Sequence, residues 1–162
     1  MQINNVVLNS SPIISLSKSG FYHLLSELFK HIIITNEVLA EVTVKGLNDV
    51  QIDKMFSFQN IELASGNYQD ARVAGWDLGK GETSVISYAL ENKEFYAVVD
   101  DMQARQCAEL FGCKYIGTVA VIVMARRNEL ISSVREALFR IKSSGLWLSD
   151  SFIETVCKNE NE

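Results

Sequence analysis

The stretch that decides the fold is Glu94–Arg105, which reads Glu-Phe-Tyr-Ala-Val-Val-Asp-Asp-Met-Gln-Ala-Arg. Its apolar run, Phe95–Val99, stops at two adjacent carboxylates, Asp100 and Asp101, and a helical pattern follows. A short apolar run between helical segments is typical of a buried strand in a parallel sheet. Ligands of open α/β sheets bind just outside the carboxyl ends of the strands, so both aspartates are candidate site residues. The alternative is that Asp101 caps the next helix and Asp100 is only solvated.

The composition predicts one globular domain over residues 1–162. Hydrophobic residues make up 48% of the 162 positions, charged residues make up 22%, and there is one proline. This is enough apolar material for a core, and it excludes a disordered chain. The formal net charge of −5 argues against a protein held to nucleic acid by bulk charge, although it leaves room for a local basic groove.

The cysteines and the hydrophobic stretches indicate a cytoplasmic protein that does not cross a membrane. Cys107, Cys113 and Cys157 lack CxxC or CxxH spacing, which favours reduced thiols over a structural zinc site. Polar residues between positions 4 and 11 interrupt the apolar core that a secretory signal needs. The longest apolar stretch, residues 119–125, is far shorter than the roughly 20 residues that span a bilayer.

Short apolar runs alternate with helical patterns along the rest of the chain. We expect strands at residues 6–8, 32–34, 95–99 and 114–117. We expect helices at residues 13–29 (broken at Gly20), 37–44, 68–78, 82–90, 102–111, 118–125, 130–141 and 149–156. Residues 45–53 are interpreted as a polar connection, and residues 56–63 as an irregular or weakly extended piece. Alternation without a hairpin signal predicts an α/β fold with a parallel central sheet.

Polar residues stand at the ends of these elements: Asn9, Glu41, Glu82, Asp100 and Asp101. If the first and fourth strands are neighbours, these side chains converge on one crevice. Crowded carboxylates repel one another unless a cation neutralises them, and oxygen ligands with few histidines suit Mg²⁺ or Mn²⁺. Such a metal activates water and stabilises the oxygens of an in-line phosphoryl displacement.

Each of these residues also has a structural interpretation. Glu82 near a helix N-terminus is favourable for the macrodipole alone, by about 0.3–1 kcal/mol. Glu37 and Glu41 are spaced i, i+4 and could form a solvated helix face. The segment Gly79-Lys80-Gly81 is too short for a phosphate-binding loop of the GxxxxGK[ST] type.

Five motifs, taken together and in this order, resemble a PIN domain: Leu-Asn-Ser-Ser-Pro-Ile-Ile-Ser-Leu (8–16), Ile-Thr-Asn-Glu-Val-Leu-Ala-Glu-Val (34–42), Gly-Lys-Gly-Glu-Thr-Ser-Val-Ile (79–86), Val-Val-Asp-Asp-Met-Gln-Ala-Arg (98–105) and Gly-Cys-Lys-Tyr-Ile-Gly-Thr (112–118). The resemblance runs from about residue 5 to residue 156. Within the family, the chain is similar to the branch related to VapC-type toxins. The resemblance implies a three-layer α/β/α fold with a central parallel sheet.

The resemblance also implies an Mg²⁺- or Mn²⁺-dependent ribonuclease. The acidic positions of the family correspond here to Asn9, Glu41, Glu82 and either Asp100 or Asp101. Asn9 departs from the usual aspartate: its carbonyl oxygen can coordinate a cation but brings no charge, so metal affinity should fall. The resemblance further implies a homodimer, an RNA substrate and an antitoxin protein as a partner.

Three further residues are candidates for binding the RNA substrate. Ser10 and Ser11 could contact a phosphate, or they could be capping groups of the first helix. Arg105 lies four residues after Asp101 and is expected to pair with it, or else to reach a substrate phosphate.

Two alternatives belong to other classes. The chain could be a binding or interaction module that keeps the fold without turnover, because Asn9 replaces the first acid. It could also be a small nucleotide-binding α/β protein, but no glycine-rich phosphate loop follows the first strand.

Overall fold

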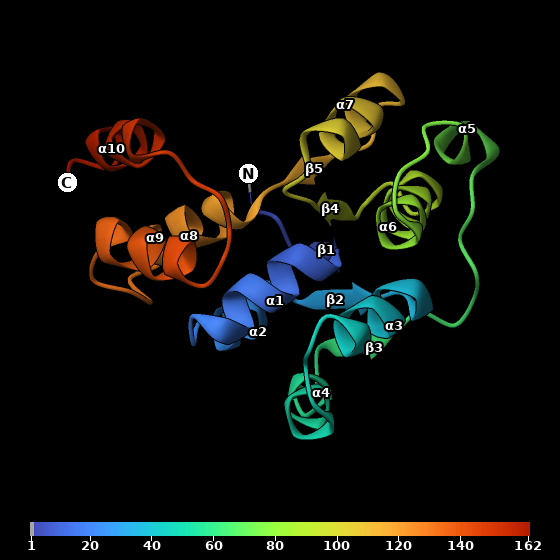
Figure 1. Cartoon of the computed structure of the whole chain (residues 1–162), viewed down its shortest axis with the longest axis horizontal. Helices are drawn as coiled ribbons and strands as arrows, with labels where there is room; N and C mark the ends of the chain where they lie inside the picture. The colour runs from blue at the N-terminus through green and yellow to red at the C-terminus, as the bar shows by residue number, and fades with distance from the viewer. Residues whose placement is uncertain (1) are drawn as a thin grey trace.

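The centre of the molecule is a sheet of five parallel strands in the order β3-β2-β1-β4-β5 (Figure 1). The computed structural model describes residues 2–162. The strands are β1 (Asn5–Leu8), β2 (His31–Ile34), β3 (Ile61–Leu63), β4 (Tyr96–Val98) and β5 (Tyr115–Ile116). Helices flank the sheet, which confirms the predicted three-layer α/β/α class with a parallel sheet.

The helices alternate with the strands as the sequence pattern indicates. They are α1 (Ser10–Lys18), α2 (His23–Leu28), α3 (Asn36–Val44), α4 (Asp49–Phe56), α5 (Ala71–Ala74), α6 (Lys80–Glu91), α7 (Met102–Leu110), α8 (Thr118–Arg127), α9 (Val134–Ser143) and α10 (Asp150–Asn159). Figure 1 shows α8, α9 and α10 gathered as a group beside α1 and α2, while α6 and α7 lie beside β4 and β5. The predicted break at Gly20 is confirmed, because that residue has a φ of +79° between α1 and α2.

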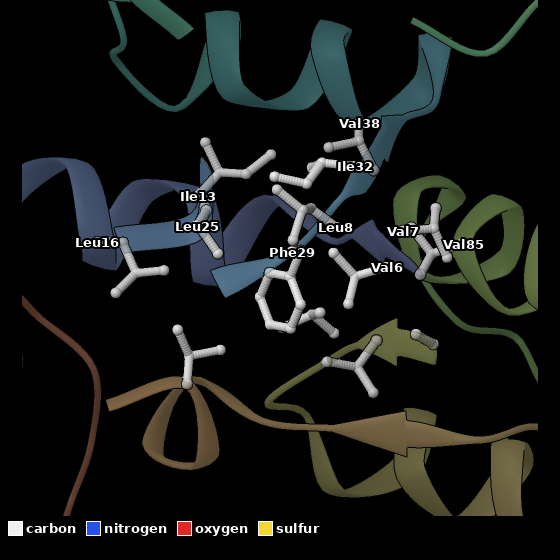
Figure 2. Close-up of a cluster of buried hydrophobic side chains, with 14 of the residues drawn as sticks. Val6, Val7, Leu8, Ile13, Leu16, Leu25, Phe29, Ile32, Val38 and Val85 are labelled. Atoms are coloured by element: carbon white, nitrogen blue, oxygen red, sulfur yellow. The ribbon is translucent and has the colours of Figure 1, made fainter. Parts of the chain in front are cut away.

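The strand β1 lies at the middle of the core. Its residues Val6, Val7 and Leu8 are fully buried, as expected for a strand with neighbours on both edges and helices on both faces. Figure 2 shows these side chains among Ile13 of α1 and Val85 of α6, which come from distant parts of the chain.

The order of the strands creates a switch point between β1 and β4. From β1 the chain runs outward through β2 to β3, then returns to the other side of β1 to form β4 and β5. Leu8 pairs with both Ile34 and Val98, so the carboxyl ends of three strands lie level with one another. The crevice beyond β1 and β4 is therefore the expected place for a ligand.

Two local predictions were wrong in the first half of the chain. Residues 49–56, interpreted as part of a connection and of an extended piece, form α4. The Asn48 side chain accepts from the Gln51 N–H, and the Gln51 side chain accepts from the Asn48 N–H. This reciprocal cap stabilises a helix start that apolar periodicity does not reveal. The extended residues after it form the regular strand β3.

The helix expected over residues 68–78 is only the four-residue α5. Asp70 takes the N-cap position by accepting from the Arg72 N–H, so no helical turn begins before Ala71. Gly75 ends the helix, and Asp77 has a φ of +55°, which no helix accommodates.

Other helix starts also differ from the prediction. The helix α6 begins at Lys80 rather than at Glu82, so the Gly79-Lys80-Gly81 segment is a helix start and not a break. The helix α8 begins at Thr118 as expected, and Gly117 occupies its N-cap position. The helix α9 begins at Val134 after the capping residue Ser133, four residues later than expected. Within residues 2–162, no helix combines the length and the apolar character needed to cross a bilayer.

Candidate active site

Asn9 and Asp100 lie side by side in the chain's topology, at the carboxyl ends of the two central strands. The Asn9 N–H donates to the Val98 carbonyl oxygen at 3.1 Å, which extends the β1–β4 pairing by one step. Asp100 follows Val99 on the neighbouring strand end. Asn9 is fully buried, whereas the Asp100 side chain keeps a tenth of its surface exposed. Both residues line the same cleft.

The Asn9 side chain is held by Glu82 from the first turn of α6. Its Nδ2 donates to Glu82 Oε1 at 2.8 Å. Because a carboxylate only accepts hydrogen bonds, the amide NH₂ must face Glu82 and the Asn9 carbonyl oxygen must point elsewhere. That buried Oδ1 has no hydrogen-bond partner among residues 2–162. A buried acceptor without a partner is costly in a folded protein, so its position calls for a donor or a cation.

Asp100 is fixed by the turn between β5 and α8. Its Oδ1 accepts from the Thr118 backbone N–H at 2.8 Å, and its Oδ2 accepts from Thr118 Oγ1 at 2.6 Å. Arg105 Nη2 lies 3.5 Å from Asp100 Oδ1, and Arg105 Nε donates to the Val99 carbonyl oxygen at 2.9 Å. A Cβ at Gly117 would collide with the Arg105 guanidinium and lie 3.1 Å from Asp100 Oδ1, so a larger residue here would displace Arg105 from its present position.

The two adjacent aspartates therefore have different environments. Asp101 Oδ1 accepts from the Ala104 N–H at 2.9 Å and caps α7, as one of the alternatives anticipated. The expected pairing of Arg105 with Asp101 was wrong: Arg105 pairs with Asp100. The reason is that Arg105 turns back across the strand end to bond the Val99 carbonyl oxygen, away from its own helix start.

Glu41 forms a separate network. Its Oε1 accepts from the Gly81 N–H at 2.8 Å, and its Oε2 accepts from Ser10 Oγ at 2.7 Å. Lys45 Nζ lies 3.6 Å from Glu41 Oε2 and donates to Ser10 Oγ at 3.1 Å. A Cβ at Gly81 would lie 2.6–2.8 Å from the Glu41 carboxylate, so glycine permits the close approach of α6. Glu41 thus joins α3 to the starts of α1 and α6.

The two serines have unequal positions. Ser10 is fully buried in the Glu41 network, while Ser11 lines the same cleft as Asn9 and Asp100. Neither serine caps α1, because the cap position belongs to Asn9 and carries no side-chain cap bond. The capping interpretation of Ser10 and Ser11 was therefore wrong.

The cleft has a volume of about 970 Å³ and two chemically distinct ends. Its polar end is lined by Asn9, Ser11, Glu82, Asp100, Asp101 and Arg105. Its other end is largely apolar and is formed by α8, α10 and the connection between α9 and α10. Glu41 lines a different cavity, of about 510 Å³, together with Glu37, Lys45 and Lys80. Four of the five polar residues expected to converge do share a cleft, and Glu41 does not line it.

The cysteines do not contribute a reactive group. Cys107, Cys113 and Cys157 are buried and unpaired within the described residues. Burial raises the pKa of Cys113 to about 11, and burial also raises the pKa values of Cys107 and Cys157. The thiols are therefore protonated at neutral pH, which excludes them as nucleophiles.

The fold and the residues at its switch point agree with one family. A family model described as a PIN domain matches residues 5–162. The chain belongs to the PIN domain family. Among the curated proteins, none matches the chain. PIN domains generally depend on a divalent metal ion.

The residues of this PIN domain can be tested for their fit to such a metal. Within residues 2–162, no three His, Cys, Asp or Glu side chains are grouped in a way that could hold a metal ion. Among the side chains that line the cleft, the candidate ligands are the amide of Asn9 and the carboxylates of Glu82 and Asp100. The other two carboxylates are engaged elsewhere, because Asp101 caps α7 and Glu160 is paired with Arg127. Mg²⁺ is commonly bound through one or two carboxylates while it keeps several waters. The unpartnered Oδ1 of Asn9 would add a third oxygen, so the chemistry of this donor set suits a weakly held Mg²⁺ or Mn²⁺.

Two contributors to the site escaped the sequence analysis. Thr118 holds Asp100 with two hydrogen bonds, and Lys45 offsets the charge of Glu41. The spacing of Glu41 and Lys45, four residues apart on one helix face, was a signal that could have identified the pair. No local signal identifies Thr118, which is 18 residues away from Asp100.

Proposed function

We propose that this PIN domain is a divalent-metal-dependent ribonuclease that hydrolyses the phosphodiester bonds of RNA. The observation that carries the proposal is the buried Asn9 Oδ1, which lacks a partner at the switch point and belongs to a residue that lines the cleft together with Glu82 and Asp100. We extend the proposal to a VapC-like toxin that acts in the cytoplasm, as a homodimer and with an antitoxin partner, in which residues 1–162 form a single domain.

In this proposal, Asn9 Oδ1, Glu82 and Asp100 hold Mg²⁺ or Mn²⁺. When bound, the metal lowers the pKa of water and stabilises the charge that develops on the phosphate oxygens. The amide brings no charge, so two carboxylates rather than three attract the ion. Because only two of the proposed ligands are charged, we expect the site to bind the metal weakly.

The surrounding residues fix the geometry of the ligands. Thr118 presents two donors to Asp100, so the carboxylate cannot rotate away from the cleft. Glu41 bonds the Gly81 N–H at the first turn of α6 and thereby fixes the helix start that carries Glu82. We therefore assign Glu41 a positioning role, whereas the resemblance would assign it a metal-binding role.

We assign Arg105 a role in binding the substrate. Its side chain lines the cleft and is about one-third exposed, while its Nε and Nη2 donate to the Val99 carbonyl oxygen and to Asp100. The remaining edge of the guanidinium can donate to a phosphate oxygen, a pairing that planar guanidinium groups favour.

The proposal is tested by cleavage of RNA in the presence of Mn²⁺. Wild type is compared with Asp100→Ala and Glu82→Ala, which remove a ligand, and with Asp101→Asn, which keeps a helix cap and serves as the matched control. We expect cleavage by wild type and by Asp101→Asn, and a loss of at least about a hundredfold in the two ligand variants. Cleavage that persists in both ligand variants would contradict the assignment of the site.

A second candidate function is a metal-free binding module that has lost turnover. It is favoured by Asn9 and by the lack of a grouped set of three metal-binding side chains in residues 2–162. Its expected result is that wild type neither cleaves RNA nor binds Mn²⁺ in calorimetry. Cleavage by wild type would exclude it.

A further inference from the structure

The apolar end of the cleft carries an aromatic side chain that packing does not explain. Trp147 lies in the connection between α9 and α10, lines the cleft, and is 85% exposed. The next residue, Leu148, is only 8% exposed and anchors the connection in the core. Phe152, in the first turn of α10, lines the same cleft and is 45% exposed. A large exposed apolar surface on a folded domain marks a place of interaction.

The two aromatic residues belong to the same cleft as the candidate metal ligands. The volume of about 970 Å³ lies at the upper end of the range of about 300–1,000 Å³ for ligand pockets. One ligand can therefore contact Asp100 at the polar end and Trp147 at the apolar end. Such a ligand must have a charged part that a cation attracts and a flat apolar part that stacks.

The charges in the cleft limit which ligand this is. The polar end carries Glu82, Asp100 and Asp101, and the apolar wall includes Glu160, which is paired with Arg127 through hydrogen bonds of 2.6 and 3.0 Å. An apolar helix or a second copy of the chain would cover these carboxylates and remove them from water, which is costly. A nucleic acid strand brings phosphates that a divalent cation and Arg105 can bind, and its bases have flat faces for the aromatic rings.

We propose that Trp147 and Phe152 form a stacking site for unpaired bases of a single-stranded RNA whose backbone lies at the acidic end of the cleft. This rests on the proposed function. Bases of a duplex are already stacked on one another, so only an unpaired strand can place a base on the indole. Because every base has a flat face, this end of the cleft gives affinity with little sequence preference.

The salt dependence of binding follows from the same geometry. The net charge of the chain is −5, and Arg105 and Arg127 are the cationic side chains that line the cleft within the described residues. A strand held by so few cationic contacts releases few counterions, so its affinity should fall only weakly as salt rises. A strand held by a broad basic surface would instead show a steep dependence.

The test uses a six-nucleotide oligoadenylate with phosphorothioate linkages, in Mg²⁺, so that binding is measured without cleavage. Since the chain has two tryptophans, Trp76→Phe leaves Trp147 as the sole indole fluorophore. We expect the single strand to quench its fluorescence and the same strand in a duplex to leave it unchanged. In the otherwise wild-type chain, Trp147→Ala should raise the Kd of the single strand about tenfold, and Trp147→Phe should retain most of the affinity.

The matched control is Phe139→Ala. Phe139 is 42% exposed, like Phe152, but it lies on α9 and lines a different cavity. We expect Phe152→Ala to weaken binding and Phe139→Ala to leave it unchanged. An equal Kd for wild type and Trp147→Ala would overturn the proposal, as would equal quenching by single strand and duplex. A change of sedimentation mass in Trp147→Ala would also overturn it, because the face would then join two copies.

Failure of the stacking site and failure of the proposed function give different results. A chain that stacks the strand but does not cleave RNA in Mn²⁺ contradicts only the nuclease proposal. A chain that cleaves RNA but binds the strand equally well without Trp147 contradicts only the stacking proposal.

Discussion

The substitution Asn9→Asp tests the central contact of the site. In the wild-type chain, the Asn9 amide donates to Glu82 Oε1 at 2.8 Å, and both side chains line the cleft beyond β1 and β4. A carboxylate at position 9 cannot donate this hydrogen bond at neutral pH. It also places two negative charges against each other at a fully buried position.

The size of the effect can be worked out from this geometry. Two ionised carboxylates about 4 Å apart repel each other by about 4 kcal/mol at an effective dielectric constant of about 20. Loss of the hydrogen bond to a charged group adds about 1.5–3 kcal/mol. Side-chain movement and solvent entering the cleft reduce the sum, so we expect a loss of about 3–5 kcal/mol in the free energy of unfolding without metal. For a chain of this length, each kcal/mol lowers the Tm by about 2–4 °C.

The assay is thermal unfolding of wild type and Asn9→Asp in chelator and in rising Mg²⁺. We expect the variant to melt at least about 6 °C lower in chelator. Its Tm should then rise more steeply with Mg²⁺ than that of wild type, because three carboxylates bind the ion more tightly.

The control is the swap Asn9→Asp with Glu82→Gln. It exchanges the amide and the carboxylate, so one donor again faces one acceptor, and it should recover most of the stability lost in chelator. The reasoning is refuted if Asn9→Asp melts in chelator at the wild-type temperature, or if Mg²⁺ shifts both proteins equally.

Three other predictions concern the supports of the site and of the fold. Asp101→Ala removes the cap of α7 and should lower the free energy of unfolding by about 1 kcal/mol in urea titration, while Mn²⁺ affinity in calorimetry is unchanged. Thr118→Val removes the hydroxyl bond to Asp100 and should cost about 1.5–3 kcal/mol in the same titration, with Thr118→Ser as the control that keeps it; equal losses in both variants would contradict the role of the hydroxyl. Burial disfavours ionisation of Glu162, but hydrogen bonds from the Val134 and Arg135 N–H groups and neighbouring donors outweigh it and lower its pKa to about 2. Its folded pKa is below its unfolded value, so its stabilisation is complete above about pH 5 and is lost as the pH falls toward 2. Acid unfolding of Glu162→Gln should lack this component.

The sequence predicted most of the fold because the apolar residues that each helix or strand buries recur at a regular spacing along the chain. Four of the five strands were expected from their short apolar runs, and Gly20 was identified as a break. The failures have local causes. The helix α4 starts from a reciprocal cap between Asn48 and Gln51, and the segment around α5 is cut short by Asp70. The start of α4 and the short length of α5 depend on hydrogen bonds of single side chains. The spacing of apolar residues does not reveal such bonds.

The candidate site was predicted less completely. Asn9, Glu82 and Asp100 were expected to share a crevice, and they line one cleft. The roles of Asp100 and Asp101 could not be separated from the sequence, because adjacent carboxylates have the same local pattern. Their separation depends on Thr118, which reaches Asp100 from the next strand end.

The sequence by itself determined the class of the fold and the kind of side chain at each strand end. Both follow from local properties, namely which residues avoid water and which stop a strand or start a helix. The tertiary structure alone decided which of those side chains meet. The strand order brings Asn9 against Glu82 across 73 residues, brings Glu41 to Ser10 across 31 residues, and places Trp147 in the cleft of Asp100. Such contacts depend on how the sheet is wound, and no spacing along the chain specifies them.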